Sequence, residues 1–216
     1  VVYLEPLALM LSKLAHQPVK MIMNRDDVMR ATGPTSGANV WVKMGAKKDG
    51  TLLAGEAILK YQAGAFAGSP VQPGCMCAFA PYDMENVKVV GFDVVTNRPK
   101  VAAYRAPGAP VSEYAVECVV DELAQKLEMD PVELRQKNEA KEGTRAAYGP
   151  KFGPIGYPEL LSQAKGLEQY NTPLGPNQGR GVASGFWFNI GGESCAALQL
   201  NVDGTLNLMI GTPDIG

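Results

Sequence analysis

The strongest constraint on the fold is one stretch, residues 101–138, in which a proline-rich turn runs directly into an amphipathic helix. After the turn, apolar side chains recur every three or four residues, which places them on one face of a helix. These side chains are Val116, Val119, Val120, Leu123 and Leu127. Pro110 suits the first helical turn, because no N–H partner is needed there. The stretch therefore predicts a long helix over residues 111–127, preceded by a rigid turn.

The turn, residues 105–110, reads RAPGAP. Its prolines carry no N–H group, so three amides remain as free donors: those of Ala106, Gly108 and Ala109. With the guanidinium of Arg105, they form a candidate cradle for an anion or an oxo group at a helix N-terminus. We expect this arginine to face a concave polar surface. A plain connection between two elements explains the same residues, and from the spacing alone it is the more frequent case.

Composition excludes several classes of function. The 216 residues carry a formal net charge of −2, with dispersed lysines and arginines, so no surface for nucleic acid or an anionic membrane is predicted. The single histidine, His16, argues against a His-rich metal site and a Ser-His-Asp triad. Four cysteines without paired C-x-x-C motifs indicate idle thiols in a reducing compartment, so we expect a cytoplasmic protein and no metal site built from this chain alone. No stretch is long and apolar enough to predict a membrane span.

The remaining patterns predict mixed α and β structure. Helices are expected over residues 4–14 and 158–169, with further helix starts capped by Asn24 and Asp130. Glu113 and Glu117 lie near the start of the central helix, where the helix dipole favours them. Predicted strands cover residues 19–23, 40–46, 51–61, 87–95, 197–202 and 205–210. Residues 63–80 are expected to be irregular, because they are rich in glycine and proline.

Two Asp-Gly pairs, Asp49-Gly50 and Asp203-Gly204, lie between consecutive predicted strands, which predicts two antiparallel hairpins. The expected organisation is an α+β segment over residues 1–143, a Pro/Gly-rich connection with one helix over 144–181, and a β-rich segment over 182–216. The fold class is therefore α+β, with a long central helix.

Several segments of the chain also resemble one known family. They are NRDDVM at 24–29, AYRAPGAP at 103–110, DPVELRQKN at 130–138 and GTPDIG at 211–216. In this order they resemble the molybdopterin-binding large subunit of the xanthine dehydrogenase and aldehyde oxidase family, the molybdenum hydroxylases. The resemblance covers essentially the whole chain. It implies a piece of the molybdenum-binding region of a larger polypeptide, and we expect this piece alone to bind no molybdenum.

The resemblance implies an oxidoreductase that hydroxylates an aldehyde or an aromatic N-heterocycle with water as the oxygen source. Its cofactor would be molybdenum–molybdopterin in a dinucleotide form, and its partners would be iron–sulfur and FAD-containing flavin subunits or domains. The family's glutamate base lies near the C-terminus of its members, so no catalytic residue is expected here. The alternative is an inactive structural or assembly module of a multi-subunit complex.

The resemblance also assigns site residues. It places five residues at the cofactor: Arg105, Ala106, Gly108, Ala109 and Gly216. It places three at the substrate pocket: Pro107, Phe186 and Phe188. Pro107 stands where the family often has an aromatic side chain, so stacking of a substrate there is doubtful.

Two positions narrow the range of possible substrates. Carbon monoxide dehydrogenases of the family carry a copper-bridging cysteine directly after the arginine, and Ala106 excludes that chemistry. Xanthine-oxidising members place an arginine in the loop that corresponds to residues 62–82, where this chain has no basic residue. The resemblance therefore favours an aldehyde or a small heterocycle over a purine.

Overall fold

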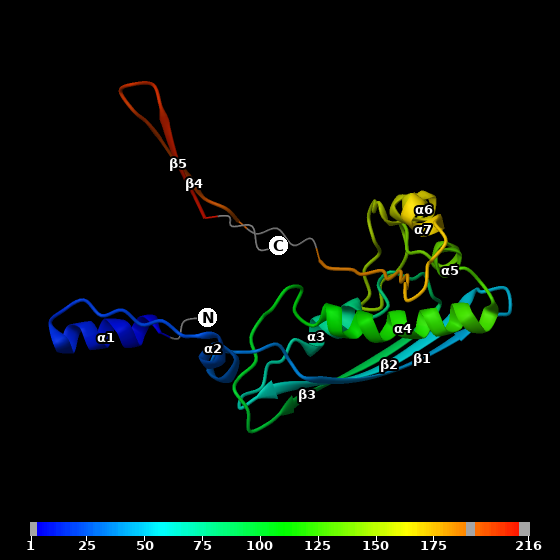
Figure 1. The fold of residues 1–216 in the computed structure, drawn as a ribbon, viewed down its shortest axis with the longest axis horizontal. Coiled ribbons are helices and arrows are strands. Elements are labelled where there is room, and N and C mark those ends of the chain that lie inside the picture. Colours follow the sequence, from blue (N-terminus) through cyan, green and yellow to red (C-terminus); the bar gives the residue numbers. More distant parts are fainter. Residues whose placement is uncertain (1–3, 189–192, 212–216) are drawn as a thin grey trace. The chain divides into compact units, whose positions relative to one another are not determined.

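The computed structural model describes residues 4–188 and 193–211 of the chain (Figure 1). Its contacts divide the chain into two compact units, one that ends at Phe186 and one that begins at Trp187. The first unit contains helices and a three-stranded sheet, and the second contains a β-hairpin. The predicted α+β class is confirmed, whereas the predicted boundaries at 143 and 181 stay a prediction. No helix of the described residues is long and apolar enough to cross a membrane.

The first unit is built on a three-stranded sheet of β1 (Ala38–Ala46), β2 (Leu52–Gly64) and β3 (Asn86–Val95), in that order. The first two strands pair antiparallel around the Asp49-Gly50 turn, which confirms the first predicted hairpin. By contrast, β2 and β3 pair parallel, so the connection between them must run back over one face of the sheet.

That connection contains α3 (Val71–Cys77), a helix in a region expected to be irregular. The expectation was wrong because Pro73 occupies the third position of the helix. The first four amides of a helix have no intrahelical acceptor, so a proline there removes no hydrogen bond. The preceding strand also continues to Gly64, beyond the expected end.

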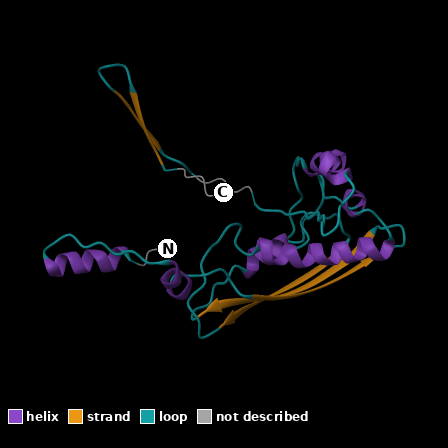
Figure 2. Cartoon of the chain, viewed as in Figure 1, coloured by secondary structure: helices purple, strands orange, loops and turns teal. Residues whose placement is uncertain are grey.

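The predicted central helix is confirmed as α4 (Ala109–Leu127), with 19 residues. It lies along one face of the sheet (Figures 1 and 2). Val116, Val120 and Ala124 are buried there and form one core cluster with Leu59 and Leu134. Burial of each valine or leucine side chain among them contributes about 1.5–3 kcal/mol. This packing gives the helix a rigid base for the residues at its N-terminus.

Three shorter helices follow: α5 (Pro131–Lys137), α6 (Tyr157–Gly166) and α7 (Glu168–Asn171). Asp130 caps α5 as predicted, because its carboxylate accepts the amides of Val132 and Glu133 at 2.9 and 3.0 Å. The single helix expected over 158–169 is interrupted at Leu167, whose backbone is extended. Two of its apolar side chains, Leu160 and Leu167, are 62% and 53% exposed.

At the N-terminal side lie α1 (Glu5–Ala15) and α2 (Arg25–Ala31). Asn24 caps α2 as predicted, in a capping box with Asp27. The buried strand expected over 19–23 was wrong: these residues have no regular structure, and Ile22 is 75% exposed. An apolar run becomes a strand only when a neighbouring strand takes up its backbone groups, and no described strand pairs with this segment.

The second unit contains β4 (Ala196–Leu200) and β5 (Leu206–Ile210). They pair antiparallel around Asp203-Gly204, which confirms the second predicted hairpin. The Asp203 carboxylate accepts the Thr205 amide at 3.0 Å, a local bond that stabilises the turn.

Candidate functional site

The turn before α4 is held from below by the end of β2. The hydroxyl of Tyr61, a fully buried side chain, donates to the Gly108 carbonyl at 2.8 Å. Just upstream, the amide of Val101 donates to the Ala63 carbonyl at 3.1 Å. The turn is therefore attached on both sides to the same strand, and its backbone position follows that of the sheet.

Gly108 could not be another residue in this turn. Its φ is 91°, in the region that favours glycine. A Cβ built on Gly108 would lie 2.0 Å from the Pro70 carbonyl oxygen and 3.0 Å from the Gly74 nitrogen, at the start of α3. The glycine thus allows the turn to pack directly against the backbone of α3.

Arg105 and two amides of the turn are unused donors. Among the described residues, neither the guanidinium of Arg105 nor the amides of Ala106 and Gly108 donate to an acceptor. The Ala109 amide, predicted to be free, instead donates to the Ala106 carbonyl at 3.0 Å. Ala106 has a φ of 46°, unusual for a residue with a Cβ. The turn therefore presents a cation and two amides without acceptors.

The expected concave polar surface around Arg105 is not what the structure shows. Arg105 is exposed, and the neighbouring concavity of about 460 Å³ is lined by its neighbour Pro107, together with Ala103, Pro70 and Pro73, without Arg105 itself. The reason is local: the left-handed backbone at Ala106 reverses the chain after the arginine. Of the predicted pocket residues, Pro107 is thus the one that lines a hollow beside the turn.

A lysine outside the 62–82 loop brings a positive charge to it. Nζ of Lys100 donates to the Gly68 carbonyl at 2.8 Å. The Asp93 carboxylate accepts the amides of Gly68 and Ser69 at 2.6 and 2.9 Å. The Ser69 hydroxyl, together with these two amides, lowers the pKa of Asp93. Both charged residues fix the loop beside the turn. The lack of basic residues within 62–82 therefore does not make this surface free of positive charge.

The segment 181–186 lies along α4 and is held by two glutamates of that helix. The Ser184 amide donates to Oε2 of Glu117, and the Phe186 amide donates to Oε1 of Glu113, both at 2.7 Å. The Tyr157 hydroxyl donates to Oγ of Ser184 at 2.7 Å. We call residues 181–186 the strap. Its attachment places Phe186, a predicted pocket residue, beside the first half of α4.

Glu117 is also the centre of a buried polar cluster. Its carboxylate accepts the Tyr82 hydroxyl and pairs with Arg135, whose side chain is fully buried. Arg135 also reaches Asp121 at 2.9 Å. Glu113 is different: among the described residues no lysine or arginine pairs with it. Burial raises the pKa of Glu113 to about 7. The hydrogen bond from the Phe186 amide lowers this pKa, and the negative charge of Glu117 raises it further.

The predicted aromatic residues lie in different surroundings. The Phe186 ring is half-buried and lies 5.4 Å from the Phe152 ring, at an angle of 50°. The Phe188 ring, in the second unit, lies 5.4 Å from that of Trp187 in an edge-on arrangement. Gly216 lies outside the described residues, so its predicted role stays a prediction.

Among the described residues, the thiols form no metal site with other side chains. In the described part of the chain, no group of three histidine, cysteine or acidic side chains is placed to hold a metal ion. Burial raises the pKa of Cys77 to about 12, with a smaller contribution from Glu113, and burial also raises the pKa of Cys75. Both thiols are therefore protonated at neutral pH.

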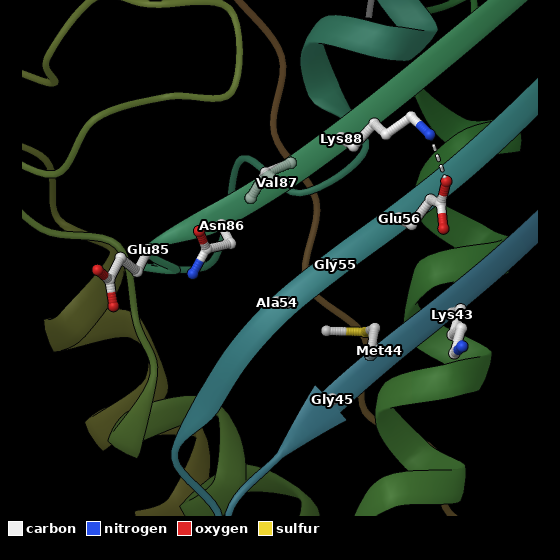
Figure 3. Close-up of a pocket in the computed structure, with 10 residues that line it drawn as sticks. All are labelled: Lys43, Met44, Gly45, Ala54, Gly55, Glu56, Glu85, Asn86, Val87 and Lys88. Carbon is white, nitrogen blue, oxygen red and sulfur yellow. Dashed lines mark hydrogen bonds and ion pairs between the residues drawn. The ribbon is translucent and has the colours of Figure 1, made fainter.

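A groove of about 590 Å³ crosses the outer face of the sheet (Figure 3). Lys43, Glu56 and Lys88 lie side by side in it on three strands, and Lys88 pairs with Glu56 at 2.9 Å. Glu56 lies five residues before Tyr61 on β2, about 17 Å along an extended strand. The groove is thus separate from the turn at Gly108, and no predicted site residue lines it.

Residues 1–139 match the family model of the molybdopterin cofactor-binding domain. The chain belongs to the molybdopterin cofactor-binding family. This confirms the family resemblance read from the sequence segments. The match includes the turn, α4 and α5, so the donors of Arg105, Ala106 and Gly108 lie within the cofactor-binding domain.

Named relatives agree with this assignment. An aldehyde oxidoreductase from Megalodesulfovibrio gigas is 33% identical over 215 residues, which cover 93% of this chain and 24% of that protein. A xanthine dehydrogenase molybdenum-binding subunit from Escherichia coli is 30% identical over 241 residues, covering 98% of this chain and 31% of that protein. The structure of the aldehyde oxidoreductase from Desulfovibrio gigas matches with a TM-score of 0.77 and 29% identity, over 96% of this chain and 24% of that one.

The chain therefore spans about a quarter to a third of the length of these relatives. Two of its site features escaped sequence reasoning, the strap glutamates and Lys100. A signal for the glutamates was present: Glu113 and Glu117 are four residues apart on a mainly apolar helix, without a lysine or arginine within one turn of either. Charges that such a helix buries need a partner elsewhere in the fold.

Proposed function

We propose that this chain forms the cofactor-facing turn and part of the substrate pocket of a molybdenum hydroxylase. The substrate class would be an aldehyde or a small aromatic N-heterocycle, hydroxylated with oxygen from water. The observation that carries the proposal is the unused donor set of the turn within the matched cofactor-binding domain: Arg105 with the amides of Ala106 and Gly108.

This donor set fits the cofactor. Molybdopterin carries phosphate and oxo groups, which accept hydrogen bonds and, for phosphate, bear negative charge. A guanidinium next to free amides at the start of a helix is a favourable partner for such groups. When bound, the molybdenum centre supplies the transfer of oxygen and electrons. Arg105, Ala106 and Gly108 would hold its oxygen-bearing groups, and the contact of Gly108 with Pro70 would keep these donors in place.

The substrate assignment is supported by the hollow beside the turn. Pro107 lines it together with Ala103 and other small or apolar groups, and Lys100 is the charged residue among them. None of the described residues that line the hollow carries an aromatic ring on which a substrate could stack, which favours a small substrate. One relative is named an aldehyde oxidoreductase. We further propose that the cofactor is a dinucleotide form, that iron–sulfur and FAD modules accept the electrons, and that the enzyme acts in the cytoplasm.

The test is Arg105→Ala in the enzyme that carries this chain, with Arg98→Ala as the matched control. Both arginines are exposed, and only Arg105 belongs to the turn. We expect Arg105→Ala to lower molybdenum occupancy or kcat by about tenfold or more, the scale of a lost charged contact. Its unfolding free energy should change by no more than about 0.5 kcal/mol, as for other exposed sites. Arg98→Ala should change neither quantity.

Two results would contradict the proposal. Unchanged occupancy and unchanged turnover in Arg105→Ala would mean that the turn does not face the cofactor, and the chain would then be a structural module. A large loss of stability with normal turnover would mean that Arg105 holds the fold. Rates for short aldehydes, quinoline-type heterocycles and purines, measured in parallel, decide the substrate class.

A further inference from the structure

We propose that Glu113 is a positioning residue that holds the backbone of Phe186 in register with the turn at Arg105–Ala109. It would thereby set the place of an aromatic side chain of the substrate pocket. The inference rests on the proposed function, in which the turn faces the cofactor, and on the predicted place of Phe186 in the substrate pocket.

The geometry of the strap carries the inference. Glu113 and Glu117 are four residues apart on α4, a rise of about 6.0 Å along the helix axis. The two amides they accept, those of Phe186 and Ser184, are two residues apart on the strap. Two residues of extended chain span about 6.6 Å. The spacing of the two carboxylates therefore matches the spacing of alternate amides, and a strap shifted by one residue would not meet both.

The order of the bonds gives the strap a direction. The earlier glutamate holds the later amide, so the strap runs antiparallel to α4, toward the end of the helix where the turn lies. Glu113 is only four residues after Ala109, the first residue of α4. One rigid helix thus carries the turn at its start and the anchor of Phe186 about one turn later.

The surroundings of Glu113 point to a role other than stability. Its carboxylate is buried and has no cationic partner among the described residues, while the charged or titratable groups that face it are Glu117 on its own helix, Tyr61 on β2 and Cys77 on α3. None of these neutralises a negative charge. An unpaired buried carboxylate lowers the stability of the fold relative to an apolar side chain. We therefore assign Glu113 the function of accepting the hydrogen bond from the Phe186 amide.

The strap is also shaped for this contact. A Cβ built on Gly185 would lie 3.2 Å from Oε2 of Glu113, so the strap backbone passes directly over the carboxylate. Beyond the anchor, the Phe186 ring packs against Phe152, which limits its rotation. The backbone bond and the ring contact together fix both the position and the direction of this aromatic side chain.

Hydrogen exchange in the molybdenum-loaded enzyme tests the anchor directly. In the wild type, the Phe186 amide should exchange more slowly than that of Gly185, which has no acceptor among the described residues. Glu113→Ala should speed exchange at Phe186 by about tenfold or more, the scale of one lost hydrogen bond to a charged or buried carboxyl group. The Ser184 amide, held by Glu117, should stay protected.

Kinetics test the consequence for the pocket. Glu113→Ala should raise KM and lower kcat/KM by about tenfold to a hundredfold per bound molybdenum, as expected when a pocket group moves by about 1 Å. Glu113→Gln should restore exchange and KM largely, because its amide oxygen still accepts the Phe186 N–H. Glu122→Ala, at an exposed position of the same helix, is the control and should change neither.

The outcomes separate this inference from the proposed function. Unprotected Phe186 in the wild type, or protection unchanged in Glu113→Ala, would show that Glu113 is not the anchor. Faster exchange with normal KM would show an anchor without influence on the substrate, and would also overturn the inference. If the proposed function is wrong, Arg105→Ala will instead show normal molybdenum occupancy and turnover, whatever the exchange rate at Phe186.

Discussion

Arg135 and Glu117 form a buried ion pair, in which Nε and Nη2 of Arg135 lie 3.0 and 2.8 Å from Oε2 of Glu117. The pair joins α5 to α4, and the same carboxylate accepts the Ser184 amide. The Glu117 carboxylate therefore links α4 to α5 and to the strap. Because a buried charge without a partner is costly, each member depends on the others.

We expect Arg135→Met to destabilise the fold by about 3–5 kcal/mol, because it leaves the Glu117 carboxylate buried without its cation. Urea unfolding followed by circular dichroism measures the change. Lys126→Met, at an exposed position near the end of α4, is the control and should stay within about 0.5 kcal/mol. A loss below about 1 kcal/mol for Arg135→Met would mean that water or another cation compensates Glu117.

Stability should fall as pH rises through the range in which Glu113 ionises. Burial is the main reason why its pKa rises from 4.5 to about 7. In that interval the folded protein keeps a proton that the unfolded chain has released, so the stabilisation is complete below pH 4.5 and is lost toward about pH 7. Glu113→Gln cannot ionise and should show a flatter profile.

The measurement is the unfolding free energy of wild type and Glu113→Gln over the same buffers. Their difference isolates Glu113, because all other titrating groups are shared. We expect the unfolding free energy of Glu113→Gln to rise relative to that of the wild type as pH increases toward neutrality. Parallel profiles for the two proteins would show that the pKa of Glu113 is the same in the folded protein as in the unfolded chain.

Gly108→Ala should destabilise the fold far more than Gly143→Ala. Both glycines have positive φ, 91° and 86°, so both substitutions carry a backbone cost of about 1 kcal/mol. Only Gly108 also meets a neighbour, the Pro70 carbonyl oxygen, whereas a Cβ on Gly143 has nothing within 4 Å. Thermal unfolding compares the two. Equal losses would mean that the turn moves away from α3 at no cost, and molybdenum occupancy would then show whether the donors moved too.

Alkylation should distinguish the four cysteines. Cys118 and Cys195 are exposed, whereas Cys77 is buried with a pKa raised to about 12. Because the thiolate is the reactive form, iodoacetamide should label the two exposed thiols in the native protein. It should label Cys77 only after unfolding, and Cys75, which is half-buried with a raised pKa, more slowly than the exposed thiols. Mass spectrometry of peptides reads the result, and early labelling of Cys77 would show that α3 opens in the native state.

Much of the local structure could be predicted from sequence. The Asn24 and Asp130 caps, the two Asp-Gly turns and the central helix depend on residues within about four positions of one another, and short patterns record such interactions. The family resemblance also came from short segments. The errors have the same origin: residues 19–23 have the composition of a strand, yet no described strand pairs with them.

Short patterns in the sequence were therefore enough to predict the central helix, both hairpins, the turn at Arg105–Ala109 and the family. What the turn and the helix after it contact depends on packing between residues far apart in the chain. Glu113 and Glu117 were explained by the helix dipole, yet they accept amides 73 and 67 residues away. The amide of Gly108 was predicted to be a donor, whereas the reason why only glycine fits at this position is the nearby Pro70 carbonyl. Buried polar groups must find partners wherever packing places them, and this requirement leaves no periodic trace in the chain.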